Sequence, residues 1–377
     1  MKQFLFLIFI NILFSCHNKD NKEVSKLFYS VDTLIINSDE RIFDLGGFMI
    51  TSDLDKEKKL FYLYNDFDLS IDQISFDEEK FIEKYSFDPE GPNGVGTHLL
   101  GIQILNDSLF FLKSFNKSAI VNKKGYVWQR INWMKSTSKN IVNIGNIPRI
   151  EIAVYKKDLI VYGLKFDYKN KQVSLAKLSV AENLEKPIDI DPKNSFENYF
   201  LTYEGSKFLA PQVFISSQNG FIMISHEFSN EIILLDNNGD LKKIVTYKSS
   251  IIPSRAEIPT IKDGEKEQIS KIYQGMLEQI RFEAPVWDEV DRRYFRLSSK
   301  RIFEQSSKNE NGLLSKKLNN EVFLSVLDEN FELISELKIK ELAEERYKYF
   351  AKNGKLWVSQ NFSDELGFLI FSFKNIK

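Results

Sequence analysis

The sequence contains a single cysteine, Cys16, among 377 residues. It can form no disulfide within the chain, so the folded body has to be stabilised by burial of apolar surface. Histidine is nearly as scarce, and His17, His98 and His226 have neither the spacing nor the cysteine partners of the usual zinc sites. We therefore expect no metal and no other cofactor. Lysine and arginine number 51 against 53 acidic residues, and this balance argues against a nucleic-acid partner.

A hydrophobic run long enough to cross a membrane is also missing, since that requires about 20 residues. The apolar run Phe4–Phe14 is shorter and predicts a secretory signal segment. It leads into Leu13-Phe14-Ser15-Cys16, which resembles a bacterial lipobox. The resemblance implies cleavage before Cys16 and attachment of lipid to it. We expect a signal peptide at 1–15 and a lipidated cysteine with a polar tether at 16–29, the alternative being a free cysteine beside an ordinary signal peptide.

Lipid on Cys16 would make the membrane the first partner, because several acyl chains on one residue anchor firmly. The residue after the cysteine is His17, whereas aspartate at this place is the inner-membrane retention signal of enterobacteria. The sequence therefore favours the outer membrane and leaves open which side of it the protein occupies.

Aromatic residues are abundant, at 14% of the chain with 32 Phe and 15 Tyr, and they favour strands. Short apolar strands separated by polar turns recur along the chain. The pattern occupies six regions, Lys59–Phe87, Asp107–Ile131, Lys157–Leu178, Gly220–Tyr247, Arg293–Lys338 and Lys355–Phe373. It predicts an all-β fold over 30–377, a β-propeller with six blades. A large β-sandwich and two smaller β domains are the alternatives.

Two further strands are predicted before the first of these regions, at Ser30–Asn37 and Leu45–Thr51. Because neither belongs to a repeat, a seventh blade stays open. In propellers an N-terminal strand often completes the last blade, and Val31–Asn37 is the candidate here.

One segment departs from the strand pattern. Apolar residues at helical spacing predict a helix within Asp263–Arg281, with Asp263 as N-cap and Glu265 in the first turn. We interpret it as a helical insertion near 263–281 between two blades. Its apolar face is expected to pack on the propeller body, and a groove for a partner is the alternative.

The densest group of turn-forming residues lies at Phe87–Gly96, where proline and glycine predict a rigid loop leading into the next blade. The order Gly91-x-x-Gly94-x-Gly96 is the reverse of the dinucleotide motif, and no Gly-Lys-Ser/Thr follows, so a phosphate cradle is not expected. Within and just after this loop, Glu90, Asn93 and His98 are candidate ligand-binding residues.

A second candidate group is Trp287, Asp288 and Arg292. An aromatic ring beside an arginine near the mouth of a propeller channel could hold a glycan or a carboxylate. The alternative is structural, with Trp287 and Tyr294 buried on strands and an ion pair between Asp288 and Arg292 in a hairpin turn.

Three features together resemble the DUF4221 lipoproteins of Bacteroidota. They are the lipobox at Cys16, the loop Glu90–Gly96, and Pro285-Val286-Trp287-Asp288-Glu289 leading to Arg292–Leu297. The similarity spans the chain after the signal peptide. The resemblance implies a propeller-like fold on a lipid anchor and assigns no catalytic residue.

These observations favour a lipid-anchored envelope propeller that binds a ligand, a glycan or a protein partner without catalysis. An envelope glycan hydrolase or lyase is the alternative, because propeller glycosidases place carboxylates from several blades in the channel. Asp88, Glu90, Asp288 and Glu289 are the acids available for that role. A scaffold in an outer-membrane complex is the third hypothesis.

Overall fold

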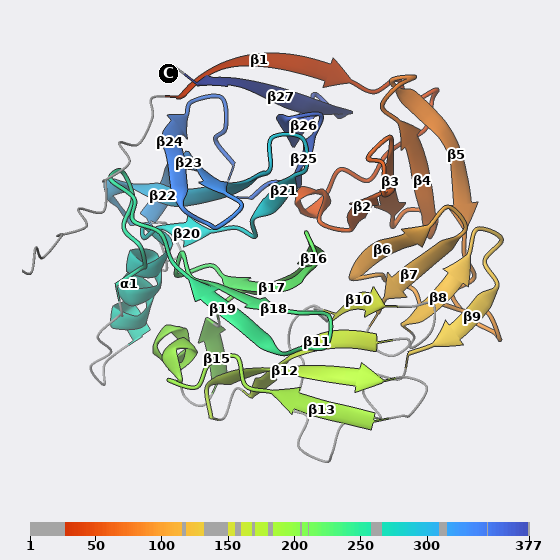
Figure 1. Ribbon diagram of the computed structural model, residues 1–377. Helices are drawn as coiled ribbons and strands as arrows, with labels where there is room; N and C mark the ends of the chain where they lie inside the picture. The colour runs from red at the N-terminus through yellow and green to blue at the C-terminus, as the bar shows by residue number, and fades with distance from the viewer. Residues whose placement is uncertain are drawn as a thin grey trace, which may run out of the picture.

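The computed structural model describes residues 27–114, 118–131, 150–154, 160–167, 170–179, 184–203, 206–209, 211–257, 266–308, 315–344 and 346–375. Their strands form six sheets of four or five strands and one two-stranded hairpin. The six larger sheets stand around a common axis, and the colour passes once around the ring from red to blue (Figure 1). The predicted all-β propeller with six blades is confirmed, and the described ranges contain no seventh blade.

Within the first five blades the strands follow chain order from the channel outwards. The first contains β2 (Ser52–Leu54), β3 (Leu60–Asn65), β4 (Ser70–Ser75) and β5 (Lys80–Ser86). The second contains β6 (Gly101–Asn106), β7 (Leu109–Lys113), β8 (Ala119–Asn122) and β9 (Val127–Arg130). The third contains β10 (Ile150–Val154), β11 (Ile160–Asp167), β12 (Gln172–Ser179) and β13 (Leu184–Ile188). The fourth contains β16 (Val213–Gln218), β17 (Phe221–His226), β18 (Ile232–Leu235) and β19 (Leu241–Val245).

In the fifth blade the innermost position is shared by β20 (Arg281–Phe282) and β21 (Val286–Asp288), which both pair with β22 (Arg293–Lys308). β23 (Ser315–Asp328) and β24 (Leu333–Ile339) follow. The sixth blade contains β25 (Tyr349–Lys352), β26 (Lys355–Phe362) and β27 (Glu365–Asn375), and its outermost strand is β1 (Leu27–Ile35).

The ring is closed by this first strand. β1 pairs antiparallel with β27 along its whole length, from Leu27 opposite Asn375 to Ile35 opposite Gly367. Pairing of the first and the last described strand in one blade confirms the predicted closure, although the strand begins at Leu27 rather than at Ser30.

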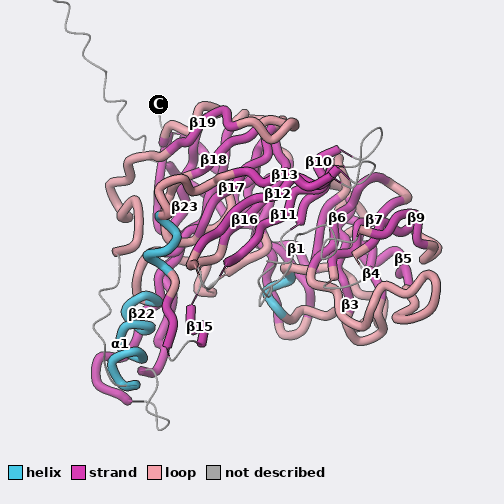
Figure 2. Tube along the Cα trace, turned by 90° about the horizontal axis from the view of Figure 1, so that it is seen from below, coloured by secondary structure: helices cyan, strands magenta, loops and turns pink. Residues whose placement is uncertain are grey.

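The two faces of the ring differ. Because neighbouring strands in a blade are antiparallel, chain reversals alternate between the faces. β1 begins and β27 ends on one side, which we call the terminal face; it also carries the turn that follows each innermost strand. The opposite side, the connector face, carries the links from one blade to the next. Figure 2 shows the C-terminus on one side of the ring, with α1 (Lys266–Leu277) and part of β22 extending on the other.

The predicted helical insertion is confirmed between the fourth and fifth blades, where α1 follows β19 and precedes β20. Met276 is 1% exposed and packs in a cluster with Phe228, so the helix contacts the propeller body as expected. Asp263 and Glu265 lie outside the described residues. No helix in the described ranges combines the length and hydropathy needed to cross a membrane.

Aromatic side chains fill the wedges between blades. The ring centroid of Phe110 in the second blade lies 5.6 Å from that of Tyr62 and 5.4 Å from that of Tyr85 in the first. Between the last blade and the first, Phe368 packs against Phe61 and Phe76 at 5.4 and 5.2 Å. Such rings bury large areas and favour these tilted and edge-on contacts, which accounts for the high aromatic content.

One predicted strand is wrong. At Leu45–Thr51 the chain forms a short 3-10 helix, η1 (Gly47–Met49), and the strand β2 begins only at Ser52. Gly47 has a φ of +57°, a left-handed conformation that interrupts an extended strand. A second 3-10 helix, η2 (Ser195–Tyr199), and the hairpin of β14 (Leu201–Tyr203) and β15 (Ser206–Leu209) lie in the link between the third and fourth blades.

Candidate functional site

The loop predicted at Phe87–Thr97 links β5 to β6 and is closed by its own backbone. The N–H group of Val95 donates to the carbonyl oxygen of Asp88 across 2.8 Å. A Cβ atom on Gly94 would lie 2.5 Å from backbone atoms of Glu90, so a larger residue cannot fit without displacing the chain. The loop has the fixed path that its prolines and glycines predict.

Asn93 faces the second blade. Its Oδ1 atom accepts a hydrogen bond of 3.1 Å from the backbone N–H of Val127, the first residue of β9. Beside it, Arg130 Nη2 donates to the carbonyl oxygen of Pro92 across 2.9 Å. These two contacts fasten the loop to β9, and they give Asn93 a structural role.

Glu90 and His98 are accessible. Glu90 is exposed, and the His98 side chain is 74% exposed with Nδ1 3.2 Å from Oδ1 of Asp66 in the turn between β3 and β4. His98 is therefore a rim residue. It is available to a ligand on the connector face, but nothing buries it.

The ion pair expected between Asp288 and Arg292 does not form, because each of these residues pairs with another side chain. Asp288 is 1% exposed, and its Oδ2 atom lies 3.2 Å from Nε of Arg293, the neighbouring residue on β22. Arg292 is exposed and pairs with Glu329 in the next turn of the same blade. The side chain that enters the blade is Arg293, because its neighbour Arg292 has a φ of +51° in the turn and points outwards.

Trp287 packs against Tyr294, with ring centroids 4.6 Å apart, and Tyr294 is fully buried. The structural interpretation expected both rings to be buried, whereas Trp287 is only half-buried. Trp287, Asp288 and Arg292 lie on or beside the turn between β21 and β22, on the terminal face of the fifth blade. Glu90, Asn93 and His98 lie in the link from the first blade to the second.

The six predicted residues thus form two separate groups that do not share a site. The same division applies to the acids considered for catalysis, since Asp88 and Glu90 lie in the first link and Asp288 and Glu289 at the fifth blade. Among the described residues, no group of three His, Cys, Asp or Glu side chains is arranged to hold a metal ion.

A buried polar cluster that the sequence did not predict joins the fourth, fifth and sixth blades on the connector face. At its centre is Glu227, which follows β17 and is 2% exposed. Its Oε2 atom lies 2.9 Å from Nε of Arg281 at the start of β20 and 3.2 Å from Nη2 of Arg346 in the link before β25. Its Oε1 atom accepts a hydrogen bond of 2.8 Å from the backbone N–H of Gln212.

Electrostatics keep this carboxylate charged. Burial alone would raise the pKa of Glu227, but Arg281 and Arg346 outweigh burial and hold the pKa below its usual value. A carboxylate fixed as an anion and fully hydrogen-bonded is a poor proton donor or acceptor at neutral pH. The cluster therefore joins blades and is unsuited to acid–base chemistry.

Arg296 is completely buried beside this cluster. Its guanidinium donates to the carbonyl oxygens of Glu283 at 2.8 Å, Asn230 at 2.8 Å and Ser229 at 3.2 Å. Nearby, burial first and then the charge of Arg296 lower the pKa of His226 to about 3, so this core histidine is neutral. His226 therefore lies in the core, whereas His98 lies on the rim.

Residues 24–338 match the model of a family described as a domain of unknown function, DUF4221. The chain belongs to the DUF4221 family. The matched region begins before β1 and ends within β24, the last strand of the fifth blade. A crystal structure of a DUF4221 member from Bacteroides vulgatus is similar with a TM-score of 0.63 and 13% identity, covering 94% of this chain and 100% of the other.

A putative exported protein from Bacteroides fragilis is also similar in structure, with a TM-score of 0.49 and 10% identity over 93% of this chain and 96% of that one. Among curated proteins, none matches this chain. At 13% identity the likeness to the Bacteroides vulgatus structure shows the fold alone, and the activity of the DUF4221 chain is argued from its own residues.

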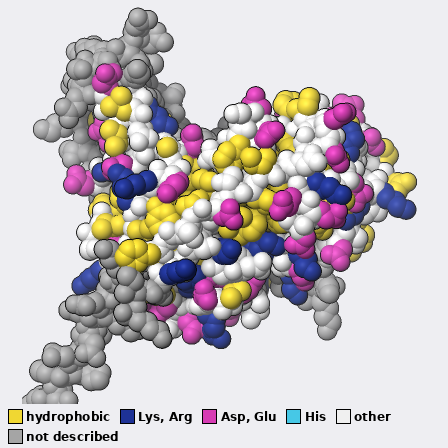
Figure 3. Space-filling model, turned by 90° about the horizontal axis from the view of Figure 1, so that it is seen from above, with side chains coloured by type: hydrophobic (Ala, Val, Ile, Leu, Met, Phe, Trp, Pro, Cys, Tyr) yellow, Lys and Arg dark blue, Asp and Glu magenta, His cyan; other side chains and the backbone are white. Residues whose placement is uncertain are grey.

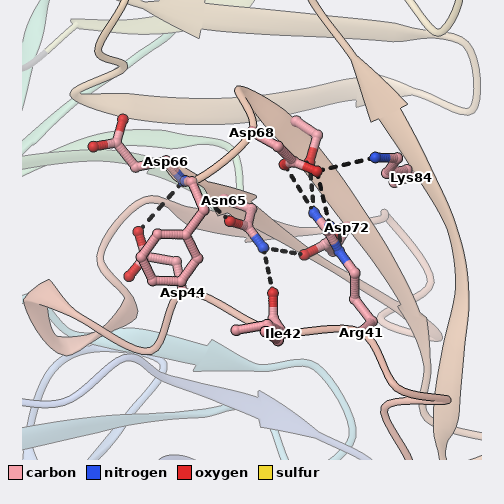
Figure 4. Close-up of polar contacts among 10 residues, drawn as sticks. Arg41, Ile42, Asp44, Asn65, Asp66, Asp68, Asp72 and Lys84 are labelled. Carbon is pink, nitrogen blue, oxygen red and sulfur yellow. Dashed lines mark hydrogen bonds and ion pairs between the residues drawn. The ribbon is translucent and has the colours of Figure 1, made fainter.

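In this DUF4221 protein a second polar cluster fixes the link between the last and the first blade (Figure 4). Arg41, in that link, donates from Nε to Oδ1 of the fully buried Asp72 at 2.8 Å and from Nη1 to Oδ2 of Asp68 at 2.8 Å. Asn65 Nδ2 bridges the other oxygen of Asp72, at 3.0 Å, to the carbonyl oxygen of Ile42, at 2.7 Å.

The pKa values of Asp68 and Asp72 shift in opposite directions. The hydrogen bond from Arg41 holds the pKa of Asp68 far below its usual range. Burial raises the pKa of Asp72, although Asn65 and Arg41 oppose it. Because every oxygen of Asp72 is used within the protein, this cluster also joins segments of the ring.

Proposed function

We propose that this DUF4221 protein is a lipid-anchored binding module of the cell envelope that presents its connector face to a ligand or protein partner and performs no catalysis. The lipid would be attached to Cys16, and the outer membrane is the expected location. The observation behind this proposal is the position of β1: the described chain begins on the terminal face, whereas α1 and the extended hairpin of β22 and β23 lie on the opposite side (Figure 2).

Chain length supports this orientation. A chain from Cys16 to Leu27 spans at most about 40 Å even when fully extended. An anchor at Cys16 would keep the propeller within this distance of the lipid, and because β1 begins on the terminal face, that face would lie nearer the membrane than the connector face, where the longer links between blades are found.

The outer rim is less suited to binding one partner. Seen from the side of β1, acidic and basic side chains are intermixed with hydrophobic ones (Figure 3). Phe28 and Ile35 of β1 are 44% and 46% exposed, and they are separated along the strand by exposed polar residues. A mixed surface of this kind produces no field of a single sign that would steer a charged partner.

The anchor is tested by expressing Cys16→Ala in a bacterium that processes lipoproteins. We expect the native chain to incorporate labelled palmitate and to sediment with membranes, and the variant to do neither. Normal palmitate labelling of Cys16→Ala would refute the anchor.

The orientation is tested with single cysteines, which is practical because the native chain has no other cysteine than Cys16. Lys355→Cys places a fluorophore on the terminal face, and Ser254→Cys places one on the connector face; both positions are exposed. Quenchers embedded in the lipid should dim the dye at 355 more strongly than the dye at 254. Equal quenching, or the reverse order, would contradict the proposed orientation.

A further inference from the structure

A groove of about 370 Å³ opens beside the fifth blade, where the end of α1 meets β22 and β23. Its floor is apolar: Ile252, Ile280 and Phe323 are 6%, 3% and 8% exposed and belong to one hydrophobic cluster. A volume at the lower end of the range for ligand pockets accommodates one or two large side chains rather than a whole cofactor.

Gly275 of α1 lines this groove and keeps it open. Gly275 lies within the helix and its φ is not positive, so its backbone conformation does not require glycine. A Cβ atom built on it would meet no heavy atom within 4 Å. After proline, glycine is the least favourable residue inside a helix. Among the described residues, no close approach of another chain segment requires a glycine here, and the space that it leaves is part of the groove.

The rim of the groove is acidic. Glu257 and Glu278 both line it and are exposed, and within the described part of the chain neither carboxylate is paired with a cation. The rim carries one lysine against these two glutamates, Lys300, which lies 2.9 Å from Glu321; this glutamate also pairs with Lys338. The charge left at the groove is negative.

We propose that this groove binds a segment of a protein partner that inserts a large apolar side chain over Phe323 and places lysine or arginine beside Glu257 and Glu278. The inference rests on the proposed function, because it specifies the chemistry of the partner that meets the connector face. An apolar floor with a charged rim is the arrangement of a peptide-binding groove. A lipid chain would contact the same floor without using the carboxylates, and an acidic segment would be repelled by them.

Four synthetic peptides of eight residues separate these alternatives. They carry a Leu-Leu or a Ser-Ser centre flanked on both sides by lysine or by glutamate. Binding to the full chain in mild detergent is followed by NMR of isoleucine methyl groups, with detergent alone as the blank. The peptide with leucine and lysine should shift the methyl signals of Ile251, Ile252 and Ile280 and bind about tenfold more tightly than the other three.

Two substitutions at one position test the groove itself. Gly275→Trp fills the open space and should weaken binding of the leucine–lysine peptide at least about tenfold. Gly275→Ala removes the glycine but leaves most of the space, so it should bind as the native chain does. Unchanged binding by Gly275→Trp would overturn the proposal.

Charge reversal gives a second test that does not depend on the tryptophan variant folding. The double variant Glu257→Lys, Glu278→Lys changes two exposed side chains and should prefer the leucine peptide flanked by glutamate. An unaltered preference, or no methyl shift with any peptide at millimolar concentration, would refute the groove. A failed lipid-anchor experiment leaves these results unaffected, so the two proposals are tested separately.

Discussion

The Nε atom of Arg41 lies 2.8 Å from Oδ1 of Asp72, a carboxylate with no exposed surface on the third strand of the first blade. Arg41 belongs to the link that leaves β1 in the last blade and enters β2 in the first. The pair therefore connects the closing strand of the ring to the blade where the ring begins.

We expect Arg41→Ala to lower the free energy of unfolding by roughly 3 kcal/mol, because it leaves the charge of Asp72 buried without its partner. Urea unfolding at neutral pH measures the loss. Lys84→Ala is the matched control: Lys84 is 48% exposed and pairs with the outer carboxylate, Asp68, so its loss should stay below about 1 kcal/mol. Equal losses in the two variants would contradict the importance given to the buried pair.

His226 predicts a pH dependence of stability. Its pKa falls from 6.5 to about 3 on folding, so between these values the unfolded chain binds a proton that the folded chain does not. Its contribution to stability is therefore complete above pH 6.5 and is lost as the pH falls toward 3, at up to about 1.4 kcal/mol per pH unit.

The variant His226→Gln isolates this effect. Glutamine can keep an acceptor for the backbone N–H of Phe228, which His226 Nδ1 accepts at 3.3 Å, but it does not titrate. Between pH 6 and pH 4, the unfolding free energy of the variant should change less steeply with pH than that of the native chain. The difference in slope should be about 1.4 kcal/mol per pH unit, which corresponds to one proton. An unchanged slope would show that His226 is protonated in the folded state.

The loop at Phe87–Thr97 provides a steric prediction. Gly94→Ala places a Cβ atom 2.5 Å from the backbone of Glu90 and should lower the melting temperature by several degrees, since the whole turn has to shift. Gly91→Ala is the control: Gly91 has a φ of +84° but open space around it, so it adds strain of about 1 kcal/mol without a clash. A larger loss for Gly91→Ala would contradict the steric argument.

The outer three strands of most blades could be predicted from the sequence, and the innermost strands largely could not. The segments of β3, β4 and β5 can be predicted because apolar runs alternate there with turn residues. The innermost β2 has only three residues and β25 only four, too short for a period to be visible. Their positions are set by neighbouring blades rather than by local sequence.

The buried cluster around Glu227 could not be predicted for a related reason. Arg281 and Arg346 lie 54 and 119 residues away along the chain, and no spacing or motif connects the three. Only the ring brings them together, because each stands at the connector end of a different blade. By contrast, the loop containing Gly94 could be predicted, since its backbone path is fixed locally by the prolines and glycines of its own sequence.

Glu227 gives the last prediction. The variant Glu227→Gln keeps an oxygen for the N–H of Gln212 but turns an amide toward Arg281 and Arg346, which lose their buried counter-charge. We expect a loss of roughly 3 kcal/mol at neutral pH. The pKa of Glu227 is lower in the folded chain than its ordinary value of 4.5, so its stabilisation is present above that value and is lost as the pH falls through the folded pKa.

The difference between the native chain and Glu227→Gln should therefore shrink below pH 4.5, and urea unfolding at neutral and acidic pH measures it. Glu329→Gln is the control, because Glu329 is a 45% exposed partner of Arg292 and should contribute less than about 1 kcal/mol. If Glu227→Gln were no worse than this control, the apolar wedges alone would hold the three blades together.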